Sequence, residues 1–238
     1  DGQRSINSRE LYTRLAQRVI MMLGTQTLSG RLYEIDMRLR PSGESGLLVS
    51  SMEAFESYER KDAWTWEHQA LVRARAVAGS AKLQGEFDKL RANILSTPRD
   101  PAELIEDVCS MRTRMRSEFA KKPSSERSKL SFIIKHSLGG IVDIEFMVQY
   151  LVLANCAAHP ELLSYPDNVR ILEAARAAEL LDAEEHDLLT EAYLGLRSAL
   201  HRFALAQMEQ GELPEELAQL QAGVERVWQR LFPSTETS

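Results

Sequence analysis

Four charged side chains alternate with apolar ones in the segment 31–40, and their spacing suits phosphate and metal chemistry. The charged residues are Glu34, Asp36, Arg38 and Arg40. Residues two apart on a strand share a face, about 6.6 Å from one another. Since Mg²⁺ prefers carboxylate oxygens and arginine binds phosphate bidentately, this face could hold a divalent cation on Glu34 and Asp36 and a polyphosphate on Arg38 and Arg40. A solvated hairpin face with cross-paired charges gives the same alternation, so that alternative stays open.

A second group of candidate residues lies in the segment 64–75, which combines aromatic, amide and basic side chains. On a helix, Trp66, Gln69 and Arg73 fall on one face, where they could cup a nucleotide. Tryptophans at helical spacing more often anchor a core, and we favour that interpretation for both tryptophans of the segment. Arg73 and Arg75 stay as weaker nucleotide or phosphate contacts, because arginine can also cover an aromatic ring.

The third group follows the glycine pair Gly139-Gly140. A glycine pair at a helix start exposes backbone N–H groups that can bind an anion, and acids in the first turn suit the helix dipole. Helix capping explains Asp143 and Glu145 equally well. Residues two apart on a helix point to different faces, so we do not expect these two acids to share a metal ion.

Other familiar catalytic patterns are absent from the sequence. It contains no Gly-x-Ser-x-Gly, phosphate-binding lysine loop, His-Glu-x-x-His or Cys-x-x-Cys motif, which removes the usual hydrolase, NTPase and zinc-site interpretations. Cys109 and Cys156 are isolated, so they predict no disulfide framework and favour a reducing cytoplasm.

The composition is typical of a globular protein. Of 238 residues, 44% are hydrophobic and 27% charged, which excludes a disordered chain. No apolar run approaches the ~18 to 20 residues of a bilayer span, so we expect no membrane protein. The net charge of −6 divides unevenly, with 22 Lys and Arg against 18 Asp and Glu in residues 1–130 and 7 against 17 in residues 131–238. This split argues against a nucleic-acid-binding protein and allows an anionic small ligand near the first part, although ordinary solvated surface explains it more simply.

Hydrophobic periodicity predicts a mainly α fold. An apolar stripe of helical spacing predicts a packed helix that ends at Gly24. Alternation predicts a half-buried strand over 31–40 and a returning strand at 47–49, which together form a hairpin. We expect a loop over 121–129 and a short strand or extended segment at 131–135. Further helices are predicted at 51–59, 63–78, 80–95, 101–119, 141–158, 167–181, 183–209 and 214–232.

Three blocks, in this order and separation, resemble the glutamine synthetase adenylyltransferase family, also called glutamate-ammonia ligase adenylyltransferases. The blocks are LYEIDMRLRPSG at 32–43, WEHQALVRAR at 66–75 and GGIVDIEF at 139–146. QYLVL at 149–153 and DNVRILE at 167–173 extend the resemblance, which covers essentially the whole chain. Together the blocks are very specific.

The resemblance implies a function. Members of this family are large two-headed bacterial enzymes in which each half pairs a nucleotidyltransferase domain with a helical bundle. One half uses ATP and Mg²⁺ to attach AMP to a tyrosine of glutamine synthetase, and the other removes it by phosphorolysis. The implied partners are glutamine synthetase and the PII signalling protein, with glutamine as an effector. A block ending Arg-Pro-Ser-Gly, rather than Arg-Pro-Phe-Gly, points to the C-terminal, adenylylating half.

The resemblance also implies a gap. Such a site carries a Gly-Ser motif followed by two aspartates one residue apart, and a third carboxylate on a neighbouring strand. Asp36 matches the third carboxylate, a catalytic metal ligand. We expect the first pair to precede Asp1, because the chain starts without a methionine or signal peptide and resembles an excised segment. The isolated chain is therefore expected to be inactive.

The expected architecture is the C-terminal part of an α+β nucleotidyltransferase domain over residues 1–50, a helix plus a β-hairpin, followed by a helical bundle over 51–238. Two alternatives stay open, the first within the same class of enzymes and the second in a different class. The first is a relative of the PII uridylyltransferases, which is disfavoured because the Trp-Glu-His-Gln block fits that family poorly. A helical regulatory module without chemistry of its own, which binds glutamine synthetase, PII or glutamine, fits the isolated chain well.

Overall fold

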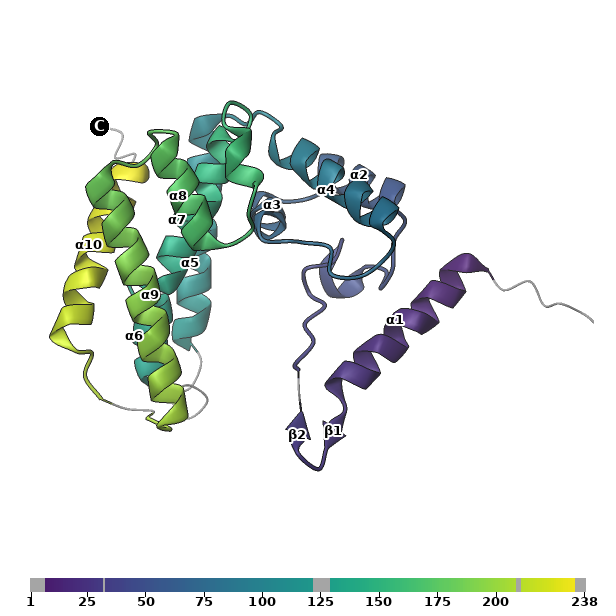
Figure 1. The fold of residues 1–238 in the computed structure, drawn as a ribbon, viewed down its shortest axis with the longest axis horizontal. Helices are drawn as coiled ribbons and strands as arrows, with labels where there is room; N and C mark the ends of the chain where they lie inside the picture. Colours follow the sequence, from purple (N-terminus) through teal and green to yellow (C-terminus); the bar gives the residue numbers. More distant parts are fainter. Residues whose placement is uncertain (1–6, 32, 122–128, 209–210, 234–238) are drawn as a thin grey trace, which may run out of the picture. The chain divides into compact units, whose positions relative to one another are not determined.

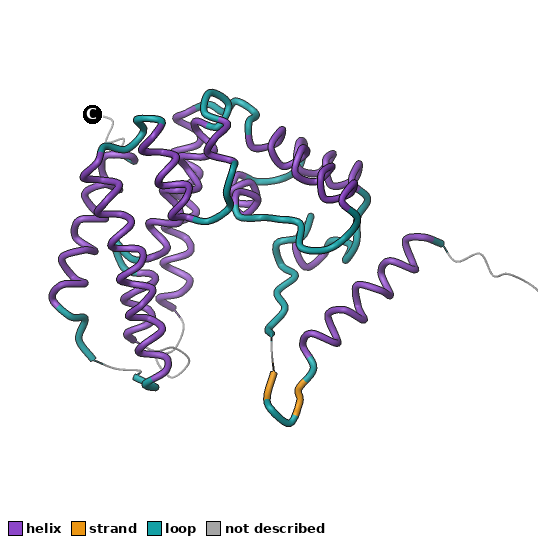
Figure 2. The backbone as a smooth tube through the Cα atoms, viewed as in Figure 1, coloured by secondary structure: helices purple, strands orange, loops and turns teal. Residues whose placement is uncertain are grey.

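A computed structural model of the chain is mainly helical, which confirms the predicted fold class (Figure 1). Coloured by secondary structure, the described part shows β-strands only in one short hairpin (Figure 2). The chain divides into two compact units, Asp1–Glu67 and His68–Ser238. The structure describes residues 7–31, 33–121, 129–208 and 211–233.

The first unit begins with a helix whose apolar face is open. Its elements are α1 (Ser8–Gly24), β1 (Gln26–Thr27), β2 (Gly30–Arg31), η1 (Gly43–Ser45), α2 (Met52–Lys61) and the first turn of α3 (Thr65–Val72). Helix α1 ends at Gly24, as predicted. It buries none of its residues, so the expectation of a packed helix is wrong for this chain. The side chains of its stripe, Leu11, Leu15, Val19 and Met22, are 45 to 69% exposed.

The predicted hairpin is wrong in position. The observed hairpin pairs Gln26 with Arg31 and Thr27 with Gly30, and residues 33–49 contain no strand. A strand needs the ladder hydrogen bonds of a neighbour, whatever its side-chain pattern. No strand pairs with 33–40 within the described residues, and local turns use the backbone instead. The Asp36 carboxylate accepts from Arg38 N at 2.9 Å, and Arg40 N donates to Met37 O at 3.4 Å.

The second unit is a helical bundle centred on α7 (Figure 1). Besides the rest of α3, its elements are α4 (Ala81–Leu95), α5 (Pro101–Lys121), α6 (Lys129–His136), α7 (Ile141–Asn155), η3 (Pro160–Leu163), α8 (Asn168–Ala177), α9 (Ala183–Leu205) and α10 (Glu215–Leu231). Helix α7 contacts α5, α6, α8, α9 and α10 and is mostly buried. The extended segment predicted at 131–135 is helix α6, because Leu130 and Ile134 bury the same face one turn apart. Most of the predicted loop at 121–129 lies outside the described residues.

Helix α3 ends at Val72, six residues earlier than predicted, because a buried arginine caps it. Arg91, on α4, is 8% exposed and donates to Leu71 O at 3.0 Å and also to Val72 O. These carbonyls belong to the last turn, where a helix lacks internal partners. Arg73 and Arg75 therefore follow the helix and do not share its face with Trp66.

One apolar segment, Lys129–Asn155, is long enough by length and composition to cross a membrane, contrary to our expectation that no such run exists. Its most apolar window is 67% buried inside the protein. The segment is also interrupted at residues 137–140, between α6 and α7. The burial identifies these helices as the core of the bundle.

The tryptophans near α3 are not core anchors. Trp64 is 70% exposed and Trp66 is half-buried, so truncating Trp66 should cost less than the about 3–5 kcal/mol typical of a fully buried aromatic. The buried residue of this turn is Glu67, 7% exposed, which accepts from Tyr58 Oη at 2.8 Å and Trp64 N at 3.0 Å. Glu67 thus fixes the connection between α2 and α3.

A second buried carboxyl lies beside it. Glu59 is 7% exposed, and burial, with the nearby charge of Glu67, raises its pKa to about 7. Because the pKa is raised in the folded chain, the folded state holds a proton that the unfolded state releases near pH 4.5. Stability should therefore fall as the pH rises from about 4.5 through 7.

We predict that Glu59→Gln removes this pH dependence. The variant should be more stable than the original chain at pH 8, by roughly 2 kcal/mol, and nearly equal to it at pH 4.5. Thermal unfolding followed by tryptophan fluorescence across this pH range measures the difference. Identical pH profiles of the two proteins would contradict the burial-raised pKa.

Candidate functional site

The charged residues of segment 34–44 border one surface cavity of about 640 Å³ in the first unit. Asp36 is paired with Arg38, whose Nη2 lies 2.6 Å and Nε 3.0 Å from its oxygens. This hydrogen bonding lowers the pKa of Asp36 to about 2, so the carboxylate is ionised at neutral pH. Asp36 and Arg38 thus lie together, as expected for the predicted charged face, but a turn and not a strand brings them together.

Arg40 has a structural task in the same loop. Its guanidinium donates to Met37 O at 2.6 Å, to Glu44 O at 2.8 Å and to Gly46 O at 3.3 Å. The loop is tight, because a Cβ atom at Gly46 would lie 1.8 Å from Pro41 O. Arg40 therefore closes the loop that presents Asp36, and its capacity to bind phosphate as well stays a prediction.

The loop supplies only part of a metal site. Glu34 and Asp36 border the same cavity, and both are exposed enough to meet a ligand. In the part of the chain that the structure describes, no three or more His, Cys, Asp or Glu side chains gather where they could hold a metal ion. Two carboxylates suit a hard cation but do not complete its coordination.

The second and third sequence blocks meet each other in the second unit. Gln69 Nε2, on α3, donates to Gln149 Oε1 on α7 at 3.0 Å, and Arg73 Nη1 lies 3.2 Å from Glu145 Oε1. The residues that suggested a nucleotide cup thus join α3 to α7. Arg75 is exposed, and no hydrogen bond or ion pair ties it to another described residue.

Among the charged candidates selected from the sequence, Asp143 is the most buried. It is 1% exposed and accepts from Arg112 Nε at 2.5 Å, Arg116 Nη2 at 3.2 Å and Gly139 N at 2.7 Å. Asp143 therefore binds the two arginines and the backbone before α7 and does not cap the helix, whose N-cap residue Gly140 has no side-chain cap hydrogen bond. Glu145 points to a different partner, as the two-residue spacing predicts. Sequence reasoning missed both arginines, whose i, i+4 spacing on α5 was the available signal.

The glycine pair serves packing rather than an exposed anion site. Gly139 has a φ of +69°, and a Cβ there would lie 1.9 Å from Gln221 O on α10. Its N–H is used by Asp143, and the Gly140 N–H donates to Ser137 O at 3.0 Å. Both N–H groups of the pair are thus occupied within the chain.

We predict that Asp143→Asn lowers the free energy of unfolding by about 3–5 kcal/mol, because it leaves Arg112 buried without a counter-charge. Urea denaturation followed by circular dichroism measures the loss. Glu145→Gln is the matched control, since it makes the same chemical change on the same helix at a half-exposed pair and should cost about 1 kcal/mol or less. Equal losses in the two variants would contradict the role of Asp143.

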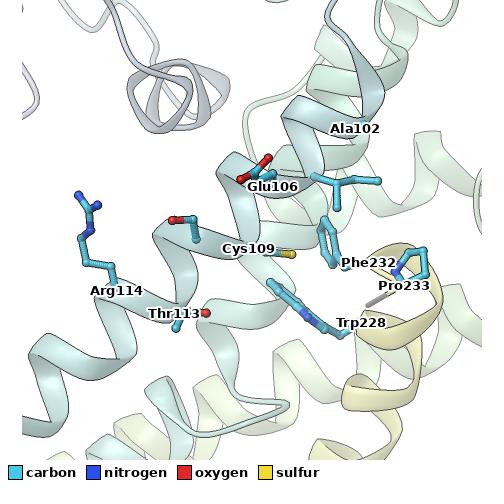
Figure 3. A pocket seen from close by; sticks show the side chains of 10 residues that line it. Ala102, Glu106, Cys109, Thr113, Arg114, Trp228, Phe232 and Pro233 are labelled. Atoms are coloured by element: carbon cyan, nitrogen blue, oxygen red, sulfur yellow. The ribbon is translucent and has the colours of Figure 1, made fainter. Parts of the chain in front are cut away.

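A further cavity, of about 860 Å³, lies between α5 and the end of α10 (Figure 3). The Cys109 side chain points toward Trp228 and Phe232 (Figure 3), whose ring centroids are 4.3 Å apart. Burial raises the pKa of the Cys109 thiol, so the thiol is neutral and a weak nucleophile. We therefore assign these residues to packing.

Comparison with known proteins covers nearly the whole chain. Residues 1–90 match the family model of glutamate-ammonia ligase adenylyltransferase, and residues 110–229 match that of GlnD PII-uridylyltransferase. A bifunctional glutamine synthetase adenylyltransferase/adenylyl-removing enzyme of Hahella chejuensis is 48% identical over 97% of the chain. Proteins with the same description from Pseudomonas aeruginosa and Shewanella loihica are 48% and 50% identical over 97% and 92% of it. The chain spans about a quarter of the length of these relatives, 22 to 24%.

Proposed function

The chain belongs to the glutamine synthetase adenylyltransferase family, and we propose that it is part of an enzyme that transfers AMP from ATP to a tyrosine of glutamine synthetase. The observation that carries the proposal is that these relatives match nearly the whole of this chain. We assign the chain to the adenylylating half, because its first block ends in Arg-Pro-Ser-Gly. We place the enzyme in the cytoplasm, where the free cysteines Cys109 and Cys156 would stay reduced.

Asp36 is the proposed catalytic carboxylate, with Glu34 as a second metal ligand. Its lowered pKa and its position at an open cavity support this role. When bound, Mg²⁺ would neutralise charge on the phosphates of ATP. Water and the phosphates of ATP would complete the shell of an ion held by two carboxylates, and the family resemblance implies a further pair of aspartates for the site.

The proposed phosphate contacts differ in how free they are. Arg38 is exposed and already oriented by Asp36, so it is the stronger candidate of the first unit, whereas Arg40 is engaged by three carbonyls. In the second unit, Arg75 is exposed and Arg73 is paired with Glu145. Each is proposed as a contact to ATP in its own unit.

A regulatory module is the second candidate function. Residues 110–229 match a PII-uridylyltransferase model. This match supports a role for the helical bundle in recognising the PII signalling protein or in responding to glutamine. For the chain by itself, such binding requires no metal site.

We predict that the isolated chain transfers no AMP. Incubation with labelled ATP, Mg²⁺ and glutamine synthetase should leave the synthetase unlabelled, because the sequence lacks the Asp-x-Asp pair that the family resemblance implies for the active site. Label above that of a sample without the chain would contradict the proposed division of the active site.

We predict that Asp36→Asn abolishes transfer in a complete enzyme. The Pseudomonas aeruginosa relative, with its matching segment replaced by this chain, provides that context. The amide keeps the shape but loses the charge that a hard cation needs, so activity should fall at least about 100-fold while the circular dichroism spectrum is unchanged.

Asp62→Asn, at the exposed end of α2, is the control for this experiment and should keep full activity. If Asp36→Asn retains more than half of the activity, Asp36 is not a metal ligand and the loop is an ordinary charged surface.

A further inference from the structure

A cavity of about 630 Å³ within the second unit has one apolar wall and one charged wall. Four helices and the residue that follows α3 converge on it. The apolar wall consists of Met115, Phe119, Ile141, Val142, Phe146 and Leu200. The charged and polar wall consists of Arg73, Lys135, His136, Glu145, Gln149, Arg197 and His201. We call this cavity the basic pocket.

Two cations of the basic pocket have no acidic partner. Arg73 is paired with Glu145, the one carboxylate among the described residues that border the pocket. Lys135 and Arg197 form no ion pair with any described residue. Arg197 is held by a neutral group instead, because it donates to Tyr193 Oη at 3.0 Å and lies 5.4 Å above that ring. The pocket therefore keeps an excess of positive charge.

This excess is unusual for its place in the chain. Residues 131–238 contain only 7 Lys and Arg against 17 Asp and Glu, yet two of those seven, Lys135 and Arg197, border the same cavity. Like charges around a concave, partly apolar site repel one another and raise the local concentration of anions.

We propose that the basic pocket binds a small organic phosphate, with the phosphate group on Lys135 and Arg197 and the body of the molecule against the apolar wall. Arginine offers a planar fork that matches phosphate, and lysine adds a mobile point charge. The apolar wall, with Phe119 and Phe146, suits a ring or a hydrocarbon body. The proposal concerns the second unit alone and does not depend on AMP transfer.

The test uses the whole chain and three probes, AMP, inorganic phosphate and adenosine, with binding measured by calorimetry. We expect AMP and phosphate to compete, and AMP to bind at least about tenfold more tightly than uncharged adenosine. AMP binding should also weaken as the salt concentration rises. Equal affinity for AMP and adenosine would overturn the proposal.

Variants then locate the site. Lys135→Gln changes an exposed side chain and should weaken AMP binding by about fivefold or more, as should Arg197→Gln, while Arg197→Lys should restore part of the loss. Arg202→Gln removes the same charge from α9 away from the pocket and should bind AMP like the original chain. Unchanged affinity in Lys135→Gln, with its melting temperature also unchanged, or an equal loss in Arg202→Gln, would place the phosphate elsewhere and overturn the assignment.

Discussion

The helical bundle depends on the buried carboxylate of Asp143. A charge that is 1% exposed is tolerated only with partners, and here Arg112, Arg116 and the N–H of Gly139 supply them. The two arginines extend the network, because each also donates to His136 O, at 3.0 and 3.2 Å. One carboxylate thus ties together α5, the end of α6 and the start of α7. We infer that its main effect is to fix the register of these helices, since a shift of any of them would leave a buried charge without its partner.

The same chemistry recurs where other helices of the second unit end. The last carbonyls of a helix lack internal partners, and the five donors of a guanidinium can satisfy several at once. Arg91 does this for α3, and Arg99 for α4, where it donates to Leu95 O at 2.8 Å and Ile94 O at 3.3 Å. Burial lowers the pKa of both arginines, because removal from water disfavours the charged guanidinium. These cations serve the fold, and this separates them from Lys135 and Arg197.

Periodicity predicts the helices of this chain well because it depends only on residues three and four positions apart. It fails where a distant residue decides. The end of α3 is set by Arg91, nineteen residues after Val72, and the depth of Asp143 by Arg112, thirty-one residues before it. The short apolar run in α6 fits a strand or a helix equally, and only burial of Leu130 and Ile134 selects the helix. For the candidate site, the sequence places Asp36 and Arg38 on one charged surface, but the turn that pairs them is not encoded in the alternation.

The open face of α1 and the unformed strand over 33–40 have a common explanation in the first unit. A stripe of exposed apolar residues at helical spacing is typical of a helix that packs on another element, and strict alternation is typical of a strand that is buried on one side. The described residues of this unit form only two strands of two residues each, which offer neither a sheet for the alternating segment nor a packing surface for the stripe of α1. Residues 33–36 instead run without regular structure into a turn at 37–40, beside which Asp36 and Arg38 pair with each other. The alternation fits a strand within a larger sheet than the described residues form. Within such a strand, Asp36 and Arg38 would lie side by side on one face, as they do in the present turn, but at the spacing that the strand sets.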